Sequence, residues 1–215
     1  MTYLQLVNRV LTRLREPTVS AVTQNDYSSL VGALINDAKN IVETAHNWTA
    51  LRDVITFNTV ASTENYSLTG TGDNSRIRYA FDATTKRYIE PRANEYLDNR
   101  QTLTTTPESA PYYYTVKGKD ASNDVTVDLF PTPDASYSIS FYVVKPQAEL
   151  SDDTDELKVP SLPVIHYALA LAARERGETG GTSAAEYFSI ADNFLADAIA
   201  VDSAYHSDEQ IWYYV

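Results

Sequence analysis

The chain has 215 residues, of which 43% are hydrophobic and 21% are charged, so it can form one compact domain or two small ones. It contains no cysteine, which excludes a disulfide framework, a thiol nucleophile and a zinc site built on cysteine. With 17 basic and 29 acidic side chains the net charge is −12, which argues against a protein that reads nucleic-acid sequence, and no apolar run is long enough to predict a membrane span.

Two amphipathic helices are predicted in the first part of the chain. Apolar residues recur at helical spacing over residues 3–15, and a stronger stripe of the same kind runs over residues 27–45. Thr2 and Gln5 fit a capping box, in which each side chain satisfies an unpaired backbone N–H at the start of the first helix. We therefore expect residues 1–52 to form a helical pair.

After this pair the apolar residues recur at every second position, which is typical of β-strands. We expect strands over 54–60, 66–68, 76–81, 86–89, 112–117, 124–130 and 137–144, and one or two helical turns over 93–100. More than half of the 16 tyrosines of the chain lie in this region. Short strands at this spacing predict an antiparallel β-sandwich or small β-barrel domain over residues 53–145.

The last part of the chain carries most of the excess negative charge. Residues 146–160 are rich in Asp and Glu, and we expect an acidic linker that stays extended and solvated. Residues 161–206 predict a second helical pair, with alanine-rich helices that meet at Gly180 and Gly181. Residues 207–215 form an aromatic tail.

Helices at both ends with strands between them predict an α+β fold. We expect the two helical pairs to pack together as a four-helix bundle formed by both chain ends. The β domain is then an insertion in this bundle.

The sequence holds no constellation that is typical of catalysis. The three histidines, His46, His166 and His206, have no metal-ligand spacing, and the acidic linker lacks the glycine and the glutamate of a calcium loop. A hydrolase with a carboxylate pair ranks last, because no pair stands out among the acidic residues. We therefore expect a protein that is not an enzyme and has no cofactor and no metal.

Charged residues in two places are candidates for contacts between copies of the chain. The basic group surrounds the predicted hairpin, and the acidic group lies in the linker. These residues are Arg76, Arg78, Lys86, Arg87, Asp152, Asp153 and Asp155. A nucleic-acid surface is the alternative for the basic group, because tyrosines are interleaved with it.

The C-terminal tail is the other candidate for a contact. It consists of Ile211, Trp212, Tyr213, Tyr214 and Val215. Large aromatic side chains are favoured at interfaces, so we expect the tail either to dock into a partner or to fold back onto its own bundle.

The order of these elements resembles the head-to-tail adaptor proteins of tailed bacteriophages, also called head-completion or connector proteins, and especially those of short-tailed phages. The resemblance rests on the helical pair joined by Arg15-Glu16-Pro17, on Tyr112-Tyr113-Tyr114 in the β module, and on the passage from the acidic stretch to Pro160-Ser161-Leu162-Pro163 and the alanine-rich helices.

The resemblance implies a structural virion protein that is made in the host cytoplasm and placed at the head–tail junction. It would form a dodecameric ring that joins the portal protein to the tail nozzle or tail-tube protein. The ring would continue the channel, through which DNA passes without sequence recognition, and residues 211–215 would dock onto the portal. The alternative is a carbohydrate- or host-binding β module of a phage tail or surface protein, which the aromatic β region favours.

Overall fold

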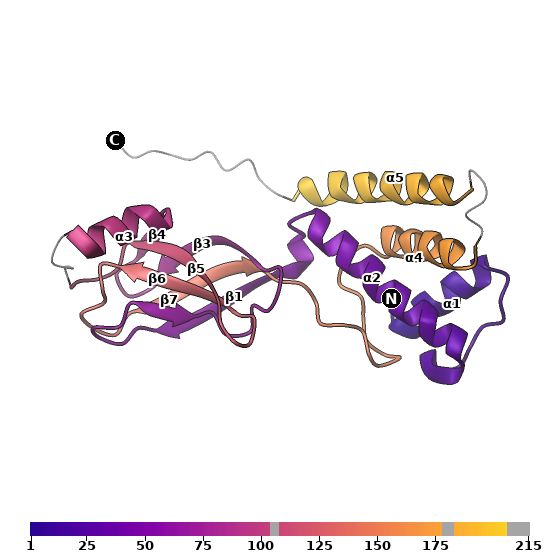
Figure 1. Ribbon diagram of the computed structural model, residues 1–215, viewed down its shortest axis with the longest axis horizontal. Coiled ribbons are helices and arrows are strands. Elements are labelled where there is room, and N and C mark those ends of the chain that lie inside the picture. The colour runs from indigo at the N-terminus through magenta and orange to yellow at the C-terminus, as the bar shows by residue number, and fades with distance from the viewer. Residues whose placement is uncertain (104–107, 178–182, 206–215) are drawn as a thin grey trace. The chain divides into compact units, whose positions relative to one another are not determined.

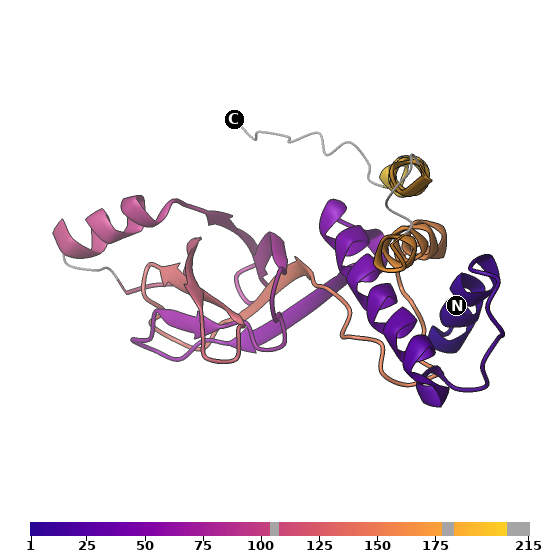
Figure 2. The same ribbon diagram turned by 45° about the vertical axis from the view of Figure 1, so that its right-hand side comes forward.

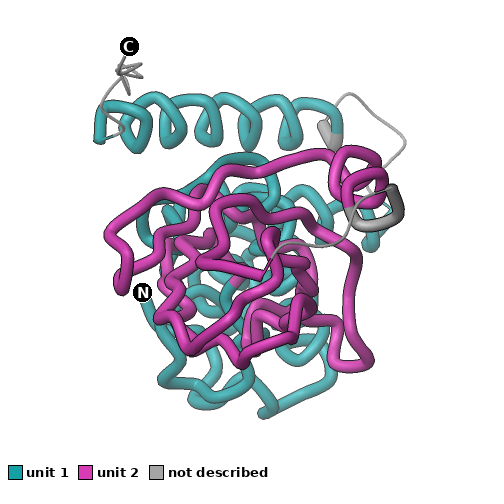
Figure 3. Tube along the Cα trace, turned by 90° about the vertical axis from the view of Figure 1, so that its left-hand side faces the viewer, with its two compact units in different colours: residues 1–51, 147–215 teal, residues 52–146 magenta. Residues whose placement is uncertain are grey.

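The computed structural model describes residues 1–103, 108–177 and 183–205 (Figures 1 and 2). The chain divides into two compact units, which Figure 3 draws in different colours. Unit 1 is Met1–Leu51 with Gln147–Val215, and unit 2 is Arg52–Pro146. Unit 1 holds helices from both ends of the chain and unit 2 holds the strands, which confirms the predicted α+β class.

The described residues of unit 1 form four α-helices. They are α1 (Tyr3–Arg13), α2 (Asp26–Ala45), α4 (Ser161–Glu175) and α5 (Ser183–Ser203), with short 3₁₀ turns at Val22–Gln24 and Thr49–Leu51. The capping box predicted at Thr2 and Gln5 is present, and Asn25 caps α2 by accepting a bond of 2.7 Å from the Ser28 N–H. Among the described residues, no helix is long and apolar enough to cross a membrane.

Helices α1, α2 and α4 pack on one another around buried aliphatic side chains. Val10 of α1, Ile35 of α2 and Ile165 of α4 have no exposed surface. Helix α5 lies along α4, as Figures 1 and 2 both show. A four-helix bundle is therefore not confirmed, because the extensive helix contact of α5 is with α4.

The predicted acidic linker differs from the structure in one respect: its middle packs against α1 and α2. Its apolar residues Leu150, Leu157 and Val159 are buried. The Asn36 side chain fixes the segment through two bonds of 3.0 Å, one from its Nδ2 to the Leu150 carbonyl and one from the Leu150 N–H to its Oδ1. The Tyr3 N–H donates to the Asp155 carbonyl at 2.8 Å. Burial of its aliphatic residues holds this segment against the helices and outweighs the charge repulsion that predicts a solvated linker.

Unit 2 is a curled sheet of seven strands in the order β1-β7-β3-β4-β5-β6-β2. The strands are β1 (Arg52–Asn58), β2 (Asn65–Ser67), β3 (Arg76–Asp82), β4 (Arg87–Pro91), β5 (Tyr113–Lys119), β6 (Val125–Phe130) and β7 (Ser138–Val144). Its core contains Ala80, Val127, Leu129, Ile139 and Phe141. In β7 the core residues alternate with half-buried ones, as the period of two predicts, whereas the residues of β6 that follow Thr126 are all buried.

One strand pair in the sheet is parallel, so the prediction of an entirely antiparallel domain is wrong at this pair. Strand β4 pairs with β5 through Glu90 opposite Tyr113 and Pro91 opposite Tyr114. Parallel neighbours need a long crossover connection. Helix α3 (Asn94–Leu103) lies in the connection between the two strands, where the sequence predicts only one or two helical turns.

Candidate interaction surfaces

The β3–β4 hairpin carries the four basic residues that the sequence singles out. Its turn forms around Asp82, whose Oδ1 accepts from the Thr84 N–H at 2.8 Å and whose Oδ2 accepts from the Thr85 hydroxyl at 2.6 Å. The four basic residues of this hairpin are exposed: Arg76, Arg78, Lys86 and Arg87. Arg78 lies at a bulge, where the pairing of β3 with β7 shifts register between Ile77 and Tyr79.

Four aromatic rings lie together on strands β3, β4 and β7, and we name them the aromatic face: Tyr79, Phe81, Tyr88 and Tyr142. Tyr79 stacks on Tyr142 with ring centroids 4.3 Å apart, and Tyr88 meets Phe81 edge to face at 5.5 Å. Tyr88 is 69% exposed and Tyr79 is 40% exposed. An ordered, exposed group of stacked rings is typical of protein interfaces, because it loses little entropy on binding.

A second aromatic group lies where α3 meets β5. The Arg92 guanidinium lies 4.6 Å from the Tyr113 ring centroid and 5.7 Å from that of Tyr96. A hydrogen bond with Tyr113 is the main reason that the pKa of Arg92 lies above its ordinary value. Sequence reasoning misses this group, because only the parallel pairing of β4 with β5 brings Arg92 beside Tyr113.

The three acidic candidates lie in one turn of unit 1. The Asp155 carboxylate accepts from the N–H groups of Asp152 at 2.8 Å and Ser151 at 2.7 Å, and these bonds lower the pKa of Asp155. Asp153 accepts from the Val22 N–H at 2.9 Å. Asp152 is exposed. The structure thus brings the acidic residues together in unit 1 and the basic residues together in unit 2. The side chains of Asp153 and Asp155 are already engaged in hydrogen bonds to backbone N–H groups.

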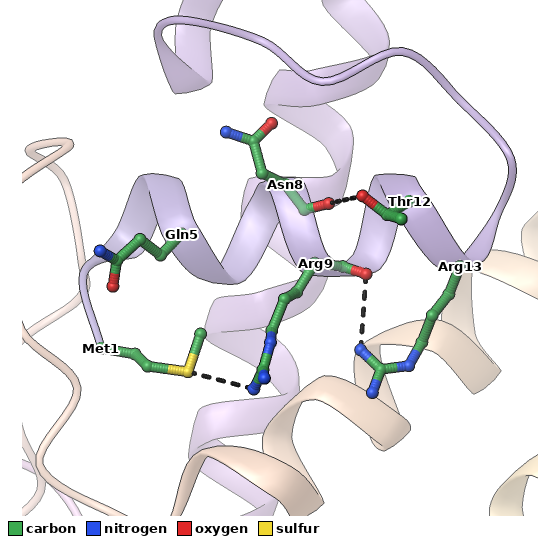
Figure 4. A pocket seen from close by; sticks show the side chains of 6 residues that line it. All are labelled: Met1, Gln5, Asn8, Arg9, Thr12 and Arg13. Carbon is green, nitrogen blue, oxygen red and sulfur yellow. Dashed lines mark hydrogen bonds between the residues drawn. The ribbon is translucent and has the colours of Figure 1, made fainter.

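A groove of about 670 Å³ lies beside α1, and we name it the α1 groove (Figure 4). It is lined by Met1, Gln5, Asn8, Arg9, Thr12 and Arg13. The Arg9 guanidinium lies 3.6 Å from the Met1 sulfur, and the Arg13 guanidinium donates to the Arg9 carbonyl at 3.5 Å. Within the described ranges neither arginine has a carboxylate partner.

The two arginines of the α1 groove influence each other and a neighbouring helix. Partial burial, and then the charge of Arg9, lower the pKa of Arg13 below its ordinary value. Burial, and then the charge of Arg13, also lower the pKa of His166 on α4. Among the described residues, the groove is therefore a site of positive charge without a carboxylate partner, on a protein of net charge −12.

Helix α5 is held to the other parts of unit 1 by polar and aromatic contacts along its length. The Tyr167 hydroxyl of α4 donates to Asp192, and the ring of His166 stacks on Phe194 with centroids 4.5 Å apart. Burial, and then the bond to Asp192, raise the pKa of Tyr167 to about 12. Near the end of α5, Asp202 accepts from the Thr49 N–H at 3.1 Å.

Other candidates from the sequence fall into two groups. His46 follows the C-terminal end of α2 as its cap residue and His166 lies on α4, and no group of His, Asp or Glu in the described part of the chain is arranged to hold a metal ion. His206 and the tail residues 211–215 lie outside the described residues.

The described residues form an α+β protein with exposed aromatic and charged surfaces. A family model described as SU10 adaptor protein matches residues 1–210. No curated protein matches the chain. The chain belongs to the SU10 adaptor family, so it is a phage adaptor protein, a structural component of the virion that contacts other phage head or tail proteins.

Proposed function

We propose that this protein forms a ring of twelve copies at the head–tail junction, where it joins the portal protein to the tail nozzle or tail-tube protein. Membership of a phage adaptor family over nearly the whole chain is the observation that carries this proposal. The ring is a structural part and has no catalytic step.

Contacts between neighbouring copies account for surfaces that an isolated chain leaves in water. The aromatic face has Tyr88 largely exposed, and α5 exposes Val201 to 64%. Burying such side chains against the next copy would stabilise a ring by about 25 cal/mol for each Å² of apolar surface. A closed ring repeats one contact between two different surfaces of the chain.

Charged contacts between copies would add register. We propose that Arg76, Arg78, Lys86 and Arg87 of one copy face the acidic turn of Asp152, Asp153 and Asp155 of the next. Because Asp153 and Asp155 already bond to backbone N–H groups, Asp152 would carry most of this contact. Exposed pairs contribute only about 0–1 kcal/mol each, so they would select the register more than they stabilise the ring.

The remaining parts of the proposal concern the channel, the tail and the division of the chain. A net charge of −12 suits a channel through which DNA slides, because such a protein does not hold phosphate. Residues 211–215 would dock onto the portal.

The helical ends, 1–52 and 161–206, would complete one four-helix bundle. The contact of α5 with α4 and the hydrogen bond from the Thr49 N–H to Asp202 support this arrangement.

Electron microscopy of the protein mixed with the portal protein from the same genome tests this function. We expect class averages in which a second ring of twelve subunits sits on the portal. A variant that lacks residues 211–215 should leave the portal bare and is the matched control for docking by the tail. Portal particles with no added density in the wild-type mixture would contradict the proposal.

The alternative function, a carbohydrate- or host-binding β module, has one specific observation in its favour. Tyr88 presents an exposed ring on the aromatic face, and sugar rings stack on such side chains. Saturable glycan binding that is lost in Tyr88→Ser would support this alternative.

A further inference from the structure

The α1 groove presents two arginines with no carboxylate in the described structure to neutralise them. Arg9 and Arg13 are one helical turn apart, about 6 Å along the axis, and both are exposed. Gln5, Asn8 and Thr12 complete the lining with amide and hydroxyl groups. Asn8 is already occupied, because it exchanges bonds of 2.9 and 2.8 Å with the backbone of Val19. The two guanidinium groups are therefore the part of this groove that can receive a negatively charged partner.

The outer face of α5 has the opposite charge, and we name this set the α5 outer face: Glu186, Ile190, Asn193, Asp197 and Val201. These residues recur at intervals of three or four, so they share one side of the helix. All five are exposed, whereas Ala191, on the side toward α4, is buried. Within the described ranges, Glu186 and Asp197 have no cationic partner.

We propose that the α1 groove of one copy receives the α5 outer face of the next copy in the ring. The charges are complementary, with Arg9 and Arg13 on one surface and Glu186 and Asp197 on the other. Asp197 and the neutral Asn193 are one helical turn apart, as the two arginines are, whereas Glu186 lies about 16 Å from Asp197 along the helix axis. This inference rests on the proposed ring.

The apolar parts of the two surfaces also match. Ile190 is 41% exposed and Val201 is 64% exposed on either side of Asp197. The Met1 side chain and the aliphatic stems of the two arginines offer apolar cover for them. Desolvation by these side chains would strengthen the charged contact.

The two surfaces are different patches of the same chain, so the contact is heterologous. A contact of this type does not stop at a dimer. It repeats from copy to copy until the ring closes. An adaptor ring requires such a repeating contact, whereas a contact between two identical patches would stop at a dimer.

Charge exchange tests the contact in the full chain mixed with the portal protein. The half-exchanged variants Arg9→Glu/Arg13→Glu and Glu186→Arg/Asp197→Arg place like charges together. We expect each to raise the protein concentration needed for half-assembly by about tenfold or more. The variant that carries all four changes restores complementarity and should return to about the wild-type concentration. Arg15→Glu/Arg174→Glu is the matched control, because it reverses two exposed arginines of the same unit that lie outside the groove.

Disulfide trapping separates a failure of this contact from a failure of the ring. The chain has no cysteine, so the variant Thr12→Cys/Asn193→Cys introduces one thiol on each surface. We expect oxidation of the portal-bound ring to produce a ladder of covalent multimers, which neither single-cysteine variant gives.

A portal-bound ring without the ladder, whose half-exchanged variants assemble as well as the wild type, overturns this contact and leaves the ring intact. If the same variants instead lose affinity for duplex DNA, the arginines contact phosphate and the proposal is also overturned. The absence of any ring in the wild-type mixture removes both the ring and the contact.

Discussion

Replacing Lys39 by Met tests a buried ion pair that fixes the segment after unit 2 to α2. The Lys39 ammonium lies 3.4 Å from Glu43 Oε2 and donates to the Gln147 carbonyl at 2.7 Å. The Gln147 N–H in turn donates to Glu43 Oε1 at 3.4 Å. Lys39 has no exposed surface and Glu43 is 5% exposed. Lys39→Met therefore leaves a carboxylate in the interior without its cation.

The burial of Lys39 and Glu43 determines how much stability Lys39→Met loses and how this loss depends on pH. Removing one partner of a buried pair costs about 3–5 kcal/mol, a large share of the stability of a typical domain. Burial raises the pKa of Glu43 in the folded protein, although Lys39 opposes this shift. A raised pKa means that the folded state binds the proton of Glu43 more tightly than the unfolded state does. The contribution of Glu43 to the free energy of unfolding is therefore present at acidic pH and is lost as the pH rises. Lys39→Met removes a charge that lowers this pKa, so the variant should lose least stability at acidic pH, where Glu43 is protonated, and most at neutral pH.

Urea unfolding followed by tryptophan fluorescence measures this loss in unit 1. The chain has two tryptophans, and a Trp212→Phe background leaves Trp48, which is 1% exposed. The control is Lys39→Met/Glu43→Leu, which removes both charges and should recover most of the stability, because an apolar pair of similar volume is often neutral there. A loss below about 1 kcal/mol in the single variant, or no recovery in the double variant, would refute the reasoning.

Three further predictions concern other parts of the chain. Gly32→Ala should lower the free energy of unfolding by about 1–2 kcal/mol in a urea titration, because the added methyl group would collide with the Tyr3 hydroxyl, and this overpacking exceeds the gain in helix propensity. Tyr167→Phe should lower the free energy of unfolding by about 1 kcal/mol at pH 8. In an ultraviolet titration, the variant should lack the tyrosine whose pKa is about 12 in the wild type. Because this pKa is raised, Tyr167 contributes stability that is lost as the pH rises from the pKa of the unfolded state, about 10, towards 12. Deleting residues 211–215 should leave the melting temperature unchanged and abolish the complex with the portal; a large fall in the melting temperature would show that the tail is part of unit 1.

Most elements of the fold follow from local patterns in the sequence. The capping box at Thr2, the helical stripe that begins near Tyr27 and the alternation in β7 each report a local preference, and the structure has a helix or strand at each place. The hairpin turn around Asp82 follows from the same local chemistry.

The pairing of distant segments does not follow from the sequence. Strand β7 lies between β1 and β3, and β4 pairs with β5 in parallel, because contacts between segments that are far apart in the sequence decide these neighbours and local spacing does not. The bonds from Asn36 to Leu150 join residues that are far apart in the chain. The acidic composition around Leu150 hides the few apolar side chains that fix this segment.

The candidate surfaces divide in the same way. The basic residues of the hairpin and the acidic turn can be named from composition and charge. The α1 groove cannot, since Arg9 and Arg13 near the end of a helix are typical of residues that interact with the helix dipole. Only the structure shows that they line a groove without an acidic partner among the described residues.

The mass of the protein in solution, measured by light scattering alone and after addition of the portal protein from the same genome, tests the adaptor ring most directly. We expect a complex whose mass exceeds that of the portal by about twelve copies of this chain, whether or not the protein alone is a monomer. Elution of the two proteins as separate species, each at its own mass, would contradict the account.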